Sequence, residues 1–185
     1  LNFSLIYKMK KFKLTSILVL ISLSIFSQLR KKDTLLIFND FFHNQQTSLA
    51  LLSGWSVANL TISPISSENL FKPKNKLDYF HQMNFFFNLV NGAIAGFAHY
   101  EVNRRSKLSW TYLEIEEQRR KAIKSIKFNM GLDISYILSG LILKQLKDKV
   151  DIDYPQYTGY GNSLIIQGAY LLLYDAIFLR KIRKR

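Results

Sequence analysis

Two acidic residues, Asp133 and Asp175, stand inside apolar stretches that contain no lysine or arginine. A carboxylate placed in lipid without a basic partner costs at least about 2.5 to 3.5 kcal/mol. We therefore expect the pair to be protonated, to be held by amides and tyrosine hydroxyls, or to share a cation. The structural alternative is that both side chains form hydrogen bonds between helices, or that Asp175 reaches the membrane surface.

A second set of polar residues lies in the segment HQMNFFFNLVNGAIAG, residues 81–96. His81, Asn84, Asn88 and Asn91 follow one another at i, i+3, i+7 and i+10, which is one stripe of a helix. Aromatic and aliphatic residues cover the rest of that helix surface. This pattern is the reverse of a water-soluble helix, and it is typical of a membrane helix that turns its amides toward neighbouring helices.

Further polar residues fall near the two aspartates. Asn129 shares a helical stripe with Asp133, and Gln167 precedes Asp175 in the last apolar stretch. If the four apolar segments alternate in direction, Asn91, Asp133 and Asp175 form one polar layer, while the other amides gather nearer the opposite end. The candidate binding residues of this polar interior are Asp133, Asp175, Asn88, Asn91, Asn129, Gln167, His81 and Asn84.

Four segments are long and apolar enough to position these residues: 45–65, 78–99, 126–146 and 161–179. A crossing needs roughly 20 apolar residues. Lysines and arginines cluster at the ends of these segments, as in membrane proteins. We predict an all-α fold, a transmembrane four-helix bundle spanning residues 28–185, placed as a multi-pass protein in the bacterial inner membrane.

Residues 1–27 resemble a secretory leader. The stretch from Met9 has a basic start, an apolar core and small residues before Gln28, which predicts a signal peptide with Met9 as the true start. A cleaved leader would place the new N-terminus outside the cytoplasm. The distribution of basic residues between the loops favours the reverse orientation, so both orientations stay open.

The net charge of +13 points first to a polyanion as partner. The basic clusters flank apolar segments and do not line one face of a soluble domain, so lipid headgroups are the expected counter-charge and no nucleic acid is expected. The chain has no cysteine, which excludes disulfides and thiolate chemistry.

Metal and catalytic chemistry have little support in the sequence. His43 and His99 would lie at the same end of two antiparallel helices, and a two-histidine haem or metal site is conceivable there. Both lie outside the apolar segments, where interfacial histidines are ordinary, so we assign no metal ligand. No phosphate loop, nucleophile elbow or HExxH pattern occurs, and we assign no catalytic residue.

Four blocks of the sequence carry a family resemblance: GWSVANL at 54–60, FHQMNFFFNLVNGAIA at 80–95, NMGLDISYILSG at 129–140 and GYGNSLIIQGAYLLLYD at 159–175. They resemble an uncharacterised family, a domain of unknown function, of small four-helix integral membrane proteins of Bacteroidota. The resemblance implies four membrane helices, and it implies no activity and no cofactor.

Two functions from different classes follow from these patterns. The first is a structural or interaction subunit, whose partners are the lipid bilayer and a membrane protein or a second copy of the chain. The alternative is a small carrier or channel-like protein that binds a proton, cation or polar solute at Asp133 and Asp175. Binding of haem, quinone or lipid is a third possibility, and the cofactor is left unknown.

Overall fold

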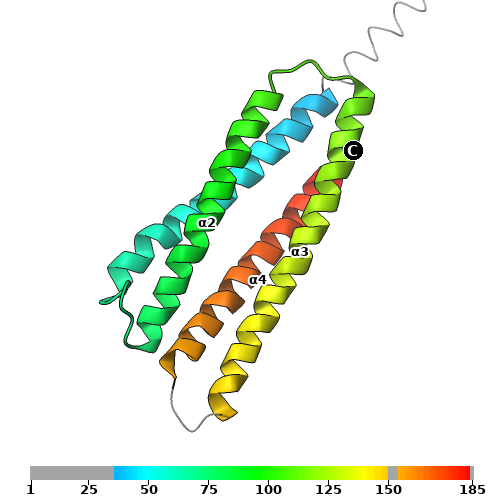
Figure 1. Cartoon of the computed structure of the whole chain (residues 1–185). Coiled ribbons are helices and arrows are strands. Elements are labelled where there is room, and N and C mark those ends of the chain that lie inside the picture. The colour runs from blue at the N-terminus through cyan, green and yellow to red at the C-terminus, as the bar shows by residue number, and fades with distance from the viewer. Residues whose placement is uncertain (1–35, 150–153, 184–185) are drawn as a thin grey trace, which may run out of the picture. The chain divides into compact units, whose positions relative to one another are not determined.

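The computed structural model describes residues 36–149 and 154–183, and all of its regular structure there is helical. A first helix, Leu36–Ser66, precedes α2 (Lys76–Arg105), α3 (Tyr112–Lys149) and α4 (Pro155–Arg183) (Figure 1). The prediction of an all-helical chain with four helices is therefore confirmed. The chain divides into two compact units, 1–40 and 41–185, and the four-helix arrangement described below belongs to the second. The predicted signal peptide lies outside the described residues.

Local sequence signals explain where α2, α3 and α4 begin. The Asn75 side chain accepts hydrogen bonds from the backbone N–H groups of Leu77 and Asp78, which caps α2. Pro155 is the first residue of α4, a position where the missing N–H costs nothing. These caps set each helix start without help from the other helices.

The start of α3 is closed by a capping box. The Thr111 N–H donates to Glu114 Oε2 at 2.8 Å, and the Glu114 N–H donates to the Thr111 hydroxyl at 3.3 Å. Hydrogen bonds from Thr111 lower the pKa of Glu114 below its usual value. The stabilisation by this cap is therefore present above the usual glutamate pKa and is lost as the pH falls through the lowered one.

Helix α4 packs against both α2 and α3, and glycines allow the closest approaches. A Cβ built on Gly161 would lie 2.7 Å from the Gly140 carbonyl oxygen, and one built on Gly140 would lie 2.6 Å from the Gly161 carbonyl oxygen. A Cβ on Gly168, two turns further along α4, would lie 2.7 Å from the Asp133 carbonyl oxygen, and one on Gly159, two residues before Gly161, would lie 2.6 Å from the Lys76 carbonyl oxygen of α2. No larger residue fits these contacts without displacing backbone.

In the sequence motif NGAIAG, residues 91–96, Gly92 and Gly96 form a small-xxx-small pattern, which predicts close helix packing at these two glycines. The structure differs. A Cβ on Gly92 would make ordinary contact with Ser56 at 3.5 Å, and a Cβ on Gly96 would meet nothing within 4 Å. Ala95 is the fully buried member of this motif. Tight helix packing occurs instead along α4, where Gly159, Gly161 and Gly168 lie.

The distribution of side chains is inverted relative to a soluble protein. Among the described residues, buried polar side chains outnumber buried hydrophobic ones, and many large apolar side chains are exposed. The buried polar set includes Ser48, Ser56, Ser63, Asn84, Asn88, Asp133, Ser163, Gln167 and Asp175. An exterior with this many exposed apolar side chains is typical of a surface that meets lipid or another protein.

Three of the helices are long and apolar enough to cross a membrane: Leu36–Ser66, Tyr112–Leu146 and Pro155–Arg183. They support a membrane protein. Helix α2 has 30 residues, which is sufficient length, but it is not one of these three. Its four-residue polar stripe lowers its overall apolar character, so a crossing by α2 remains a prediction.

Candidate functional site

Gln167 of α4 is the centre of a buried hydrogen-bond cluster that joins three helices. Its Oε1 accepts from the Trp55 indole N–H at 2.8 Å, and its Nε2 donates to Asn84 Oδ1 at 2.9 Å and to Asn59 Oδ1 at 3.4 Å. Ser163 donates to the same Asn84 oxygen at 2.6 Å. The Gln167 side chain is 0% exposed. Both ends of this amide are therefore paired, and we name these five residues the amide cluster.

Aromatic contacts hold the first helix against α4 beside the amide cluster. The rings of Trp55 and Tyr170 are stacked, with centroids 3.8 Å apart and planes 8° apart. The Tyr170 hydroxyl donates to the Leu51 carbonyl at 3.2 Å. The stacked ring is held in an orientation that points the Trp55 N–H at Gln167.

The predicted stripe on α2 divides into residues with different surroundings. His81, Asn84 and Asn88 are buried, and Asn91 is half-buried. Asn88 donates to the Asn84 carbonyl of its own helix at 2.9 Å. The buried atoms His81 Nδ1 and Asn91 Nδ2 have no hydrogen-bond partner among the described residues. The structure therefore joins Asn84 to Gln167 and leaves His81 and Asn91 outside the amide cluster.

Asp133 and Asp175 are both buried, at 3% and 5% exposure, on α3 and α4. Their carboxyl groups lie near enough to interact electrostatically. The buried Asp133 Oδ2 has no hydrogen-bond partner in the described part of the chain. We name these two residues the carboxyl pair. The sequence analysis expected Asn91 to lie in one layer with these two aspartates, but the Asn91 Nδ2 atom forms no hydrogen bond with either of them.

A cavity of about 500 Å³ lies within the second unit. It extends from Arg105, at the end of α2, to Asp175 of α4. Its walls are mainly apolar, and its polar lining includes Asn129, Tyr174 and Asp175. Asn129 is an exposed residue of α3, and it shares the lining of this cavity with Asp175 of the carboxyl pair. Arg105 and Lys121 also line the cavity, and Lys121 forms an ion pair with Glu117 at 2.7 Å.

Metal binding was not predicted from the sequence. Across residues 36–149 and 154–183, no three histidine or acidic side chains are grouped so that they could hold a metal ion. A two-residue carboxyl pair offers oxygen ligands suited to a proton or a hard cation, and further ligands would come from water or a solute.

Sequence reasoning did not assign two buried residues that the structure makes important. Ser163 lies one helical turn before Gln167, and that spacing was a usable signal for the amide cluster. Arg119 is 8% exposed; it donates to the Ile182 carbonyl at 3.2 Å and its guanidinium lies over the Phe41 ring. Its spacing from Glu116, three residues earlier, indicated only a surface ion pair.

The fold and the inverted side-chain distribution together define a class: an all-helical protein whose helices are compatible with a bilayer and whose interior is polar. The chain belongs to the Family of unknown function (DUF6992), which covers residues 51–176. The matched region contains the amide cluster and the carboxyl pair. No curated protein and no solved structure matches the chain.

Proposed function

We propose that the chain is an integral protein of the bacterial inner membrane and that its four helices cross the bilayer. We propose that it serves as a structural or interaction subunit. The observation that carries this proposal is the paired state of Gln167 at the centre of the amide cluster. An interior whose central amide is satisfied by its own protein has no need of a ligand there. The apolar exterior is then the surface that contacts lipid, a second copy of the chain or another membrane protein.

The surface of α2 supports its inclusion among the crossing helices. Phe86, Val90, Ile94 and Phe97 are between 46% and 69% exposed, while Asn84 and Asn88 on the opposite stripe are at most 4% exposed. In water this arrangement would expose aromatic surface and bury amides, both at a cost. In a bilayer the same arrangement is favourable.

A crossing by α2 places its two flanking loops on opposite sides of the membrane. Because the chain has no natural cysteine, Glu68→Cys and Lys107→Cys each provide one unique label site in these loops. In sealed vesicles, an impermeant maleimide added outside is expected to label one variant and to reach the other only after detergent is added. Equal labelling of both variants in intact vesicles would contradict a crossing by α2.

A second function is favoured by one observation, the buried Asp133 Oδ2 without a partner. In this alternative the carboxyl pair binds a proton, a cation or a polar solute, and the cavity that reaches Asp175 is the access route. An intramembrane carboxyl without a basic partner is costly, and a bound species that neutralises it removes this cost.

Native mass spectrometry of the gently solubilised protein separates the two functions. The wild type is compared with the Asp133→Asn, Asp175→Asn double variant, which retains shape and hydrogen bonding but removes both charges. A binding site predicts a bound ion or solute in the wild type and its loss in the variant. A subunit predicts the same oligomer or partner in both forms and no such ligand.

The control is the Asp40→Asn, Glu68→Gln double variant, which removes the same formal charge from two exposed side chains. It is expected to match the wild type under either function. If it also lost the bound species, net charge and not the carboxyl pair would explain the loss, and the second function would be rejected.

A further inference from the structure

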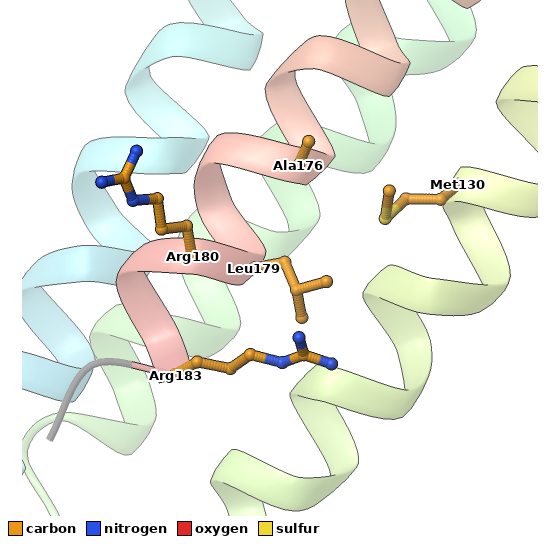
Figure 2. Close-up of a pocket in the computed structure, with 5 residues that line it drawn as sticks. All are labelled: Met130, Ala176, Leu179, Arg180 and Arg183. Carbon is orange, nitrogen blue, oxygen red and sulfur yellow. The ribbon is translucent and has the colours of Figure 1, made fainter.

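A groove of about 360 Å³ separates α3 from the last two turns of α4. It is lined by Met130, Ala176, Leu179, Arg180 and Arg183 (Figure 2). Ala176, Leu179 and Arg183 follow one another at i, i+3 and i+7, so they lie on one face of α4. The groove is apolar along its length and basic at the end of the helix.

Figure 2 distinguishes the two arginines. Arg183 extends from α4 toward α3, across the end of the groove. The guanidinium of Arg180 points away from Met130, so only the stem of that side chain borders the groove. Leu179 and Met130 enter the gap from opposite helices, which makes the walls next to Arg183 apolar.

The charge around the groove is positive. None of the ion pairs between described residues uses Arg183. The facing part of α3, residues 118–132, contains five basic residues and no acidic one. The acidic residues that border these segments are paired or buried: Glu116 and Glu117 form ion pairs with Arg119 and Lys121 on α3, and Asp133 and Asp175 are buried inside the bundle. An anion at Arg183 therefore meets no exposed acidic residue on these two helix segments.

We propose that this groove is a binding site for an anionic phospholipid. One acyl chain lies against Met130, Ala176 and Leu179, and the phosphate is bound by Arg183. A planar guanidinium matches the geometry of phosphate oxygens. An apolar slot that ends in an arginine at the edge of a membrane helix is complementary to an acyl chain that ends in a phosphate.

This inference rests on the membrane placement of the proposed function, and a first measurement tests that placement alone. The wild type is reconstituted with neutral phosphatidylcholine vesicles and floated on a density gradient after an alkaline wash. Flotation with the vesicles is expected. Failure to float would overturn the membrane placement and the lipid site together.

The lipid site itself is tested by native mass spectrometry with an equimolar mixture of phosphatidylglycerol and phosphatidylcholine of matched chain length. The retained anionic lipid is expected to exceed the neutral one about fivefold, the factor given by roughly 1 kcal/mol for one arginine near the surface. Arg183→Gln is expected to abolish this preference. Arg180→Gln, which removes the same charge one turn earlier, is expected to retain most of it.

Ala176→Trp tests the acyl part of the site by filling the groove, and it is expected to reduce retention of both lipids. Equal effects of Arg180→Gln and Arg183→Gln would overturn the proposal, because net charge would then explain the preference. Glycerol phosphate bound as tightly as the lipid, or a second copy of the chain displaced by Ala176→Trp, would also overturn it, since either would be a different occupant.

Discussion

Replacing Gly161 with leucine is expected to lower the free energy of unfolding by about 3 kcal/mol or more. A Cβ at this position would lie 2.7 Å from the Gly140 carbonyl oxygen, which belongs to the backbone of α3 and cannot rotate away. The whole of α3 would have to move, and the contacts along α4 would separate with it. Equilibrium unfolding of the detergent-solubilised protein in sodium dodecyl sulfate, followed by circular dichroism, measures the change.

Gly96→Leu is the matched control for this prediction. It introduces the same side chain into a helix at a glycine whose Cβ would meet nothing within 4 Å. Because leucine favours a helix over glycine by up to about 1 kcal/mol, the control is expected to be neutral or slightly more stable. Similar losses in both variants would show that α3 and α4 do not approach one another closely at Gly161.

Replacing Gln167 with leucine is expected to cost about 2 to 4 kcal/mol of stability. The change leaves the Trp55 indole N–H and the Asn59 amide oxygen without their partner in a partly buried region, and each unpaired buried group costs about 1 to 3 kcal/mol. Hydrogen bonds between membrane helices are individually weaker, so the loss lies in the desolvated groups left behind. The same unfolding assay measures it.

A double-mutant cycle with Trp55→Phe separates the energy of the Trp55–Gln167 hydrogen bond from the energy of general packing. Phenylalanine retains a ring to stack on Tyr170 and removes the N–H that Gln167 accepts. If the hydrogen bond is present, the two substitutions together cost less than the sum of the single costs. Strict additivity would show that Trp55 and Gln167 do not interact, and the amide cluster would lose its link to the first helix.

Helix geometry made part of the interior predictable. Residues at i, i+3 and i+7 share a helix face whatever surrounds it. For that reason His81, Asn84, Asn88 and Asn91 were placed on one stripe from the sequence; the first three are buried and Asn91 is half-buried. The same period placed Asp133 with Asn129 on α3, and of these two residues Asp133 is buried while Asn129 is exposed. The four-helix, all-helical chain follows from the same apolar spacing.

The partners of these residues were not predictable from periodicity. Asn84 and Asn91 have the same side chain on the same stripe, yet Asn84 accepts from Gln167 and Ser163 while Asn91 Nδ2 has no described partner. The difference comes from the described parts of the neighbouring helices, which place an amide beside Asn84 and none within hydrogen-bond distance of Asn91 Nδ2. A hydrogen bond needs a second atom within about 3.5 Å, and sequence spacing along one helix does not place that atom.

The sequence by itself determined the helices, their caps and the polar face that each turns inward, because these depend on residues within two turns of one another. Only the tertiary structure decided which glycines pack. NGAIAG has the small-xxx-small spacing that favours close helix packing, but only Gly140, Gly159, Gly161 and Gly168 meet a backbone from another helix. It also decided which of the buried amides form hydrogen bonds with one another. Both outcomes depend on the depth and rotation at which whole helices meet, and those are set by contacts between residues far apart in the chain.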